Sequence, residues 1–413
     1  MSNRQYWQNT QQLENDEAFI SAHHNEFQEE LPLVEFIGKE KLDKTTTSRR
    51  DFLKFVGFSL AAATAASCEA PVVKSIPYLI KPEEVTPGVP SYYASSFFDG
   101  FEFSSILVKT REGRPIYIKG NKVAKGFQSG VSPRVNASVL SLYDIERIKN
   151  PLQNGSESSW SEIDKTVKSK LAEIKAKGGQ VRLLSSTINS PSTLGVIAGF
   201  EKFLTTNTQE DAPTASFKHI EYDADSASGM IEANRIGFGR PVVPTYHFDK
   251  AKTIVSFSAD FLGGWLGDPG FAGQYAKNRV PSSGHMSKHY QFETTYTLTG
   301  SNADVRGVMK PSEMGKLIVM LYNIIAANVG WDKYDESTFE SDNNTRKKVA
   351  LAAVDLLKNK DHSLVVCGIN DPDIQQMING INAMLGSYGN TIDLYRASYL
   401  RKGSDKEFMK SRF

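Results

Sequence analysis

Over most of the chain beyond residue 156, apolar residues recur with the period of helices in some stretches and as short runs in others. The helical patterns cover residues 161–176, 312–329, 346–358 and 374–385, and the apolar runs cover residues 181–184, 217–222, 253–257, 364–367 and 391–394. Gly178 and Gly179 end the first helix, and Ser190-Pro191 suits a helix start. Alternating strands and helices of this kind predict an α/β fold with parallel sheets covered by helices on both faces.

The chain before residue 156 has a different pattern. Residues 105–110 and 115–120 look like two strands around a turn that contains Gly113, which predicts a β-hairpin. Residues 136–149 suit a short helix. Five prolines between Pro71 and Pro90 predict an extended arm.

Residues 48–54 form an export motif. Their sequence, Ser-Arg-Arg-Asp-Phe-Leu-Lys, fills every position of the twin-arginine pattern, with Arg49, Arg50, Phe52 and Leu53 as its defining residues. Twelve mostly apolar or small residues follow, which is too few for a membrane span, since a helix needs roughly 20. We therefore predict export of the folded chain by the twin-arginine translocase. A chance arginine pair in an amphipathic helix is the alternative.

The end of the signal leaves two interpretations open for Cys68. The run Ala65-Ala66-Ser67-Cys68 loosely matches a lipobox, which predicts a lipid-modified N-terminus. Alternatively, cleavage occurs earlier or the leader is retained, and Cys68 is a free thiol. The residues that precede the signal are polar and acidic, with eight acidic and two basic side chains up to Glu40, and we expect them to be disordered or to bind a partner through a short helix.

These patterns divide the chain into five predicted segments. They are a polar acidic extension (1–47), a twin-arginine signal with a lipobox (48–68), a proline-rich arm (69–91), a small β-rich lobe (92–155) and an α/β domain (156–413). Residues 402–413 begin an amphipathic helix without the strand that an α/β repeat would place next. We therefore expect the α/β domain to continue in a longer protein.

Composition excludes several classes of function. The 48 basic and 47 acidic side chains leave a net charge of +1, which argues against a nucleic-acid partner. Only two cysteines are present, and an iron–sulfur cluster needs three or four thiolates. Without a C-x-x-C pair, there is also no sulfur site for zinc. Cys367 lies in an apolar run and is predicted to be a buried small hydrophobic residue.

Three further features of the sequence resemble binding sites for metals, dinucleotides or cofactors. His285 and His289 have the spacing of a helical zinc pair, but the preceding residues read as a loop and the glutamate of H-E-x-x-H is missing, which favours a surface or network role. The run Gly237-Phe238-Gly239 lacks the third glycine of a dinucleotide fingerprint and reads as a turn. Residues 260–273, with Arg279, Arg306 and Lys310, either surround the remnant of a cofactor cavity or are packed loops with solvated charges. The sequence assembles no catalytic cluster.

Two segments carry a family resemblance. Residues 92–100 and 106–121, which read Ile-Leu-Val-Lys-Thr-Arg-Glu-Gly-Arg-Pro-Ile-Tyr-Ile-Lys-Gly-Asn in the second part, resemble the opening of molybdopterin oxidoreductases. Residues 129–144 resemble the segment in which cluster-bearing members place their last cysteine ligand, and Ser132 stands at that position here.

The whole chain is similar to a narrower family. Residues 259–265 (Ala-Asp-Phe-Leu-Gly-Gly-Trp) and 299–304 (Thr-Gly-Ser-Asn-Ala-Asp), together with the extension and the export motif, resemble the large iron–sulfur subunit of alternative complex III, a respiratory quinol-oxidising complex. In that family, the molybdopterin-like half holds no molybdenum cofactor, and a following ferredoxin-like half carries the clusters. The resemblance runs over essentially all 413 residues of this chain and corresponds to the N-terminal part of that subunit.

The resemblance implies a non-catalytic scaffold that supports electron transfer from quinol to cytochrome c or a terminal oxidase. No cofactor is expected in this segment, neither molybdopterin nor a cluster; iron–sulfur clusters are expected in the missing C-terminal half. The implied partners are membrane-integral quinol-binding subunits, multihaem and monohaem cytochrome c subunits and, in some assemblies, a terminal oxidase. The implied location is the periplasmic face of the cytoplasmic membrane, with Cys68 as a candidate anchor. Two alternatives stay open: an exported molybdenum oxidoreductase of the polysulfide or dimethyl sulfoxide reductase kind, and a periplasmic binding lipoprotein.

Overall fold

The computed structural model describes residues 85–124, 130–206, 214–280, 282, 284–335 and 343–411. Nearly all of them belong to one unit of the chain, Pro87–Phe413. The predicted extension, the export motif and Cys68 lie outside the described residues, and so does most of the predicted arm. Within the described part, no helix is both long enough and apolar enough to cross a bilayer.

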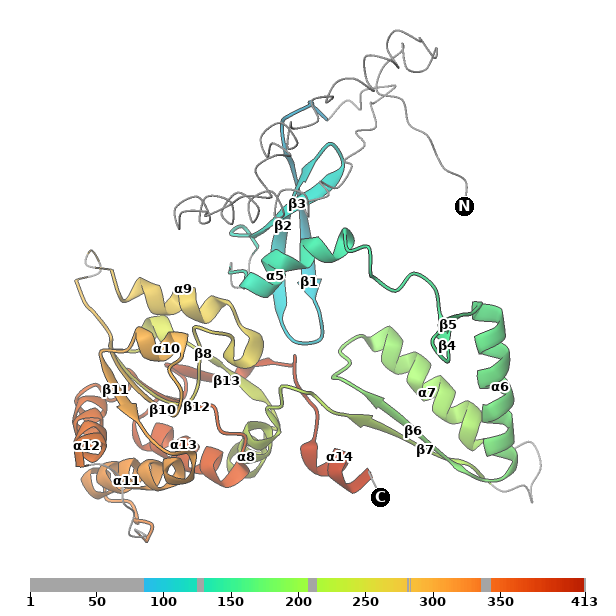
Figure 1. Ribbon diagram of the computed structural model, residues 1–413. Coiled ribbons are helices and arrows are strands. Elements are labelled where there is room, and N and C mark those ends of the chain that lie inside the picture. Colours follow the sequence, from blue (N-terminus) through green and yellow to red (C-terminus); the bar gives the residue numbers. More distant parts are fainter. Residues whose placement is uncertain are drawn as a thin grey trace, which may run out of the picture. The chain divides into compact units, whose positions relative to one another are not determined.

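The largest sheet has four parallel strands in the order β11-β10-β9-β12 (Figure 1). The strands are β9 (Thr253–Phe257), β10 (Lys288–Glu293), β11 (Val305–Val308) and β12 (Ser363–Cys367). The helices that follow or connect them flank the sheet. The predicted α/β fold, with parallel strands flanked by helices, is therefore confirmed.

Both faces of this sheet are buried. On one face lie α11 (Pro311–Val329), α12 (Asn343–Lys358) and α13 (Pro372–Met384), with α8 (Ser228–Phe238) packed beside α13 (Figure 1). On the other face lie α9 (Gly270–Lys277), η2 (Phe248–Lys250) and β8 (Val243–Tyr246). Successive strand residues point to opposite faces, so Val255 and Phe257 pack against the first group and Ile254 against the second. Because helices or loops cover both faces, β9 and β12 are buried at every position, and their sequences, Thr-Ile-Val-Ser-Phe and Ser-Leu-Val-Val-Cys, are mostly apolar.

One predicted strand has a different partner from the one expected. The strand expected at residues 391–394 is β13 (Ile392–Ser398), which pairs antiparallel with β8 rather than joining the parallel sheet. Its pairing is irregular after Asp393, whose carboxylate accepts the backbone N–H groups of Tyr395 and Arg396. The expectation that this strand extends the parallel sheet is therefore wrong: its partner is β8, and a local turn at Asp393 interrupts the ladder between them.

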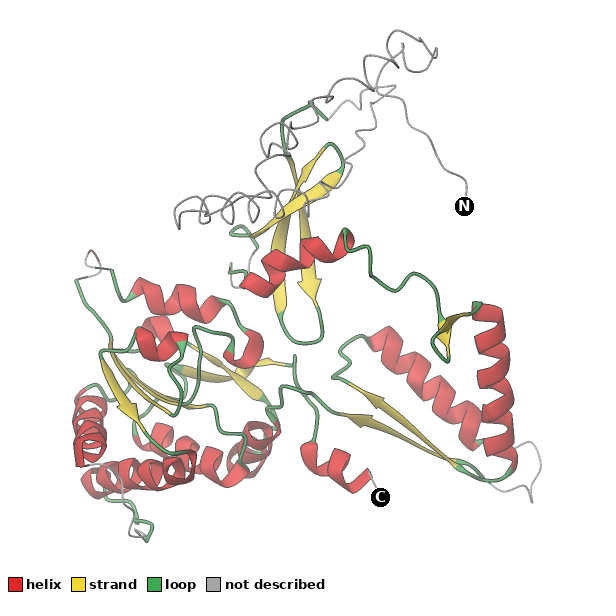
Figure 2. Ribbon diagram, viewed as in Figure 1, coloured by secondary structure: helices red, strands yellow, loops and turns green. Residues whose placement is uncertain are grey.

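The N-terminal sheet is antiparallel and has the order β1-β2-β3 (Figure 2). Its strands are β1 (Ser91–Phe98), β2 (Phe103–Arg111) and β3 (Arg114–Gly120). The predicted hairpin is confirmed as β2–β3, and its two turn residues, Glu112 and Gly113, have φ values of 51° and 76°. Two positive φ values suit the right-handed twist of a tight hairpin. Strand β1 was not predicted.

One face of this sheet is covered by a short helical segment. It consists of α5 (Pro133–Ala137) and the 3-10 helix η1 (Ser138–Leu142), and it packs Val135 and Val139 against Ile106 and Ile118. The helix predicted over residues 136–149 is wrong in extent. It begins earlier because the Ser132 hydroxyl caps it and Pro133 suits its first turn.

The remaining elements form a smaller layer and several short pieces. A two-stranded parallel sheet, β6 (Gln180–Ser185) and β7 (Ser216–Glu221), is accompanied by α6 (Trp160–Ala176) and α7 (Pro191–Thr205). The helix predicted at residues 161–176 is confirmed as α6, which starts at a capping box of Ser159 and Glu162. The short pieces are β4 (Leu152–Gln153), β5 (Ser156–Glu157), η3 (Trp265–Gly267), α10 (Leu298–Ser301) and α14 (Asp405–Ser411).

Residues 401–403 tie distant segments together. The Arg401 guanidinium is 4% exposed, donates to Asp225 and the Leu266 carbonyl oxygen, and lies 4.6 Å from the Phe101 ring centroid. Buried Asp223 accepts the backbone N–H groups of residues 402 and 403 and both the N–H and the hydroxyl of Thr187. These buried hydrogen bonds join the ends of β6 and β7 to the segment that follows β13.

Two leucines of α12 provide a matched test of this core. Leu356 is 0% exposed, whereas Leu351 is 58% exposed. We expect Leu356→Ala to lower the free energy of unfolding by about 3 kcal/mol, because it removes buried methyl groups and leaves a cavity. Leu351→Ala should change it by less than about 0.5 kcal/mol. Urea denaturation followed by circular dichroism measures both, and equal losses would contradict the described packing of α12.

Candidate functional site at the carboxyl ends of the parallel strands

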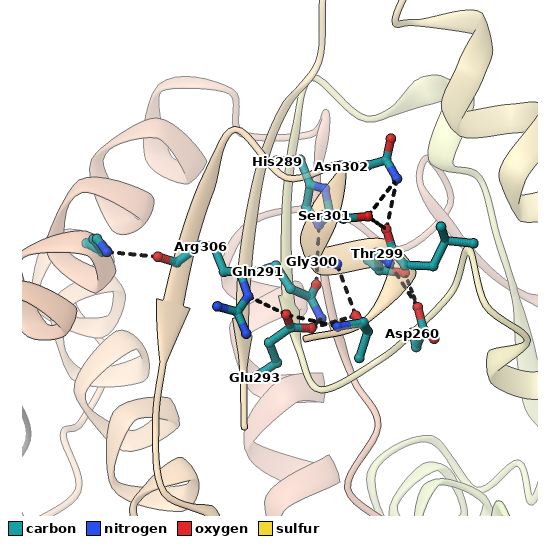
Figure 3. Close-up of polar contacts among 12 residues, drawn as sticks. Asp260, His289, Gln291, Glu293, Thr299, Gly300, Ser301, Asn302 and Arg306 are labelled. Carbon is teal, nitrogen blue, oxygen red and sulfur yellow. Dashed lines mark hydrogen bonds and ion pairs between the residues drawn. The ribbon is translucent and has the colours of Figure 1, made fainter. Parts of the chain in front are cut away.

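Open α/β sheets bind ligands beyond the carboxyl ends of their parallel strands. In this chain a polar network lies at that edge (Figure 3). Glu293 is the last residue of β10, Asp260 follows β9 by three residues, and the short helix α10 with its cap Thr297 lies between them in the network. We therefore take this network as the candidate site.

Glu293 is the centre of the network. It is 1% exposed, and its carboxylate accepts the Arg306 Nε–H at 2.5 Å, the Thr297 hydroxyl at 2.6 Å and the Gln291 amide at 3.3 Å. Burial raises the pKa of Glu293, but the hydrogen bonds from Thr297 and Arg306 outweigh burial and hold the pKa below its ordinary value. The residue is therefore a buried carboxylate whose charge is balanced by Arg306.

Asp260 is bound in a similar way. One of its oxygens accepts both the backbone N–H of Thr299, at 3.0 Å, and the hydroxyl of Thr299, at 2.6 Å. The Thr299 hydroxyl accepts the Leu262 N–H at 2.9 Å, and the Thr297 hydroxyl accepts the Gly300 N–H at 3.0 Å. The N–H groups at the start of α10 are thus satisfied within the protein.

Two glycines allow these carboxylates to lie so close to the backbone. A Cβ atom added to Gly300 would collide with the Glu293 carboxylate, and one added to Gly263 would collide with the Asp260 carboxylate. These contacts give a steric reason for glycine at both positions. They also show that protein carboxylates fill the space beside Gly263 and Gly300.

The network continues along β10, where residues 289, 291 and 293 share one face because side chains alternate. The Gln291 amide donates to Glu293, so its oxygen is left to accept from His289 Nε2, at 3.3 Å. His289 then carries its proton on Nε2, and its Nδ1 lies 3.2 Å from the Tyr275 hydroxyl. That hydroxyl is also 2.9 Å from the Asn302 carbonyl oxygen. Burial lowers the pKa of His289 to about 4, so the imidazole is neutral at pH 7.

This arrangement does not fit the anionic cofactor of molybdopterin oxidoreductases. Pyranopterin phosphates are held by free backbone N–H groups and by cations. Here the N–H groups of Thr299 and Gly300 already have partners, Arg306 is paired with Glu293, and two carboxylates would repel a phosphate.

A pocket of about 270 Å³ lies at the opposite end of the sheet, where Lys252 and His362 precede β9 and β12.

The three predicted cations do not gather at one place. Arg279 makes a two-pronged ion pair with Asp304, at 2.7 and 2.9 Å, just before the start of β11. Arg306 pairs with Glu293, whereas Lys310 precedes α11 at the other end of β11. Of the two interpretations of residues 260–273 and these cations, loop packing is the one that the hydrogen bonds support.

Other residues singled out in the sequence are also engaged structurally. His289 lies in a strand and His285 in the loop before it, so they do not form a helical metal pair, and no metal-like cluster of His, Cys, Asp and Glu occurs in the described ranges. Gly239, with a φ of 67°, ends α8, which agrees with the predicted turn. Cys367 is 1% exposed, as predicted, and burial raises the pKa of its thiol to about 12.

Two serines could suggest other chemistry: Ser132 stands at the position of a cluster ligand, and Ser185 lies beside a histidine. Both are hydrogen-bonded to protein groups. The Ser132 hydroxyl donates to buried Glu102 and accepts the Val135 N–H, so it acts as a helix cap. Ser185 lies 2.8 Å from His219 Nε2, but its hydroxyl lies 2.7 Å from the Ser186 carbonyl oxygen. Donation to that carbonyl leaves the Ser185 oxygen as the acceptor of the His219 proton, an arrangement that does not activate a serine nucleophile.

Comparison with known proteins identifies no family. No protein-family model and no curated protein matches the chain. Among solved structures, the chain is similar to acetylene hydratase from Pelobacter acetylenicus, with 12% identity and a TM-score of 0.47 over 70% of this chain. The match covers 43% of that protein, so the chain spans less than half of its length. At this level the likeness carries no argument about fold or function.

Glu293→Gln tests whether Arg306 depends on a buried negative charge. The substitution keeps the shape of the side chain but removes its charge, and we expect the free energy of unfolding at pH 7 to fall by about 2 kcal/mol. Because the pKa of folded Glu293 lies below 4.5, wild-type stability from this carboxylate is complete above that pH and is lost as the pH falls further. The variant should lack this part of the acid dependence.

Urea denaturation at a series of pH values measures the effect. Glu232→Gln is the matched control, because Glu232 pairs with Arg235 on the exposed side of α8 and should leave stability unchanged. If Glu293→Gln and Glu232→Gln behaved alike, the carboxylate at the sheet edge would not be a buried, charged group.

Proposed function

We propose that the chain is the non-catalytic, molybdopterin-oxidoreductase-like half of the iron–sulfur subunit of alternative complex III. In this proposal it lies on the periplasmic face of the cytoplasmic membrane after export by the twin-arginine translocase. It contacts membrane-integral quinol-binding subunits and cytochrome c subunits. A ferredoxin-like half that follows it would carry the iron–sulfur clusters.

The observation that supports a scaffold is the filled edge of the parallel sheet. Asp260 and Glu293 accept the hydrogen bonds that a phosphate would otherwise accept, and Arg306 is already neutralised. Two cysteines in the whole chain are too few to hold a cluster, because soft iron in such a centre needs thiolates rather than serine or lysine. In this proposal the segment holds neither cofactor, and its role is to hold other components in position.

The role of this half is geometric. Electron transfer from quinol to cytochrome c or a terminal oxidase would pass through clusters and haems held by other parts of the complex. The α/β body, with its sheet buried between helices, is a rigid support for such neighbours. No bond is formed or broken by residues of this segment in the proposed function.

Export is tested by exchanging Arg49 and Arg50 for lysine. The twin-arginine translocase reads the arginine pair, so we expect the double variant to accumulate in the cytoplasm while wild type reaches the periplasmic side. Cell fractionation and immunoblotting measure the distribution. Arg111→Lys, the same exchange outside the motif, is the control and should not alter export. Export of the double variant at wild-type levels would contradict the assignment of the signal.

Membership of a respiratory complex is tested by purification from native membranes. The full natural gene product, tagged and extracted in mild detergent, should copurify with c-type haem and with integral membrane subunits in fixed ratios. Absorbance of the reduced haems and mass spectrometry of the purified bands measure this. Isolation as a lone monomer without cytochromes would overturn the proposal and would favour a periplasmic binding lipoprotein.

A further inference from the structure

Strand β1 is an open edge of the N-terminal sheet. In the described part of the chain it pairs only with β2, through eight consecutive residue pairs from Ser91 to Phe98 without a register shift. Its sequence, Ser-Tyr-Tyr-Ala-Ser-Ser-Phe-Phe, contains no charged residue and no proline. Edge strands are usually protected from pairing by charges, prolines or bulges. β1 has none of these features, and among the described residues no strand pairs with its outer edge.

The sheet face that points away from α5 carries exposed aromatic rings and lysines. Tyr92 lies opposite Lys109, and Lys109 lies opposite Tyr117, which places the three side chains in one row across the sheet. The Lys119 ammonium lies 5.5 Å from the centroid of the Tyr92 ring. We call Tyr92, Phe98, Lys109, Tyr117 and Lys119 the aromatic–lysine face. Its three rings are between 44% and 47% exposed.

The charge of this face is positive. None of its five members is acidic. Asp99 pairs with Arg134, and Glu102 is buried and accepts the Ser132 hydroxyl. Exposed Glu112 lies in the β2–β3 turn, where Arg111 and Arg114 flank it. Lys109 and Lys119 therefore offer positive charge beside exposed rings, a combination that complements a segment with both acidic and apolar side chains.

We propose that β1 binds an extended, acidic segment of a partner protein, which adds to the sheet as a fourth strand next to β1. Backbone hydrogen bonds to the open edge supply affinity, and side chains that alternate along the added strand supply specificity. Apolar side chains on the aromatic–lysine face would lie against Tyr92 and Phe98, and acidic ones would reach Lys119. A polypeptide fits better than a lipid surface, because a lipid cannot form the repeated backbone hydrogen bonds of a strand edge. This inference does not depend on the proposed respiratory function.

Peptide binding to the full chain tests the charge requirement. The probe is a fluorescein-labelled peptide of two Val-Ser-Glu-Ser repeats, in which valine and glutamate fall on the same face of a strand. It is compared with two Val-Ser-Lys-Ser repeats and with the acidic peptide whose second valine is replaced by proline. Fluorescence anisotropy should show the acidic peptide binding at least tenfold more tightly than the other two, with an affinity that falls as salt is added. Equal binding of the acidic and basic peptides would overturn the proposal.

Charge reversal and hydrogen exchange locate the interaction. Lys119→Glu should weaken the acidic peptide at least tenfold and strengthen the basic one, whereas Lys165→Glu, on exposed α6, should change neither. The acidic peptide should slow amide exchange in residues 91–98 and leave β6 unaffected. Unchanged binding by Lys119→Glu, or no protection of β1, would refute strand addition. Binding of anionic phosphatidylglycerol vesicles without peptide discrimination would also refute it and would identify a membrane surface instead.

Discussion

The pairing of buried Glu293 with Arg306 is the constraint on which the carboxyl edge of the parallel sheet depends. A carboxylate that is 1% exposed is tolerated only where cations and hydroxyls compensate it, and here Arg306 and Thr297 do so. The requirement extends outward, since Thr297 also caps α10 and Gly300 must lack a side chain beside the carboxylate. A single buried charge thus determines the identity of several neighbours.

This constraint links the fold to the proposed function. α/β proteins bind anionic ligands at the carboxyl edge of the sheet. Here that edge carries the carboxylates of Asp260 and Glu293, which are hydrogen-bonded to neighbouring protein groups. The adjoining face of β10 is rigid for the same reason, because neutral His289 and Gln291 extend the hydrogen bonds toward Tyr275. In the proposed function, such a chain would support neighbouring components and would offer them surfaces such as β1.

The sequence predicted the apolar part of the fold well. Strands β9 and β12 and helices α11, α12 and α13 follow from short apolar runs and helical periodicity, because both faces of their sheet are covered. Helix α6, beside the β6–β7 sheet, follows from its periodicity and its stop at Gly178 and Gly179. Strand β10 was not predicted, since His289, Gln291 and Glu293 interrupt its apolar pattern. Strand β1 was missed because its polar and exposed residues resemble a loop, and the partner of β13 could not be inferred because pairing depends on tertiary contacts.

The candidate site was foreseen only in outline. Residues 260–273, Arg279 and Arg306 were singled out as a region that could hold a cofactor. Thr299 and Asp304 were noted only for the family resemblance, and Glu293 was not noted. The sequence did contain a signal for this network: polar residues stand at every second position from 289 to 293, and Thr297 and Gly300 follow them. Its meaning required the parallel register of β10 and β11, which brings Arg306 beside Gln291 and within reach of Glu293.

Whether Asp260 and Glu293 close the sheet edge to a cofactor is tested most directly by the pterin and metal content of the protein made in a host that produces molybdopterin. Acid oxidation followed by pterin fluorescence, with elemental analysis for molybdenum and tungsten, measures that content per chain. We expect background amounts of all three. One pterin per chain, with or without metal, would show that Asp260 and Glu293 do not close the sheet edge to a cofactor.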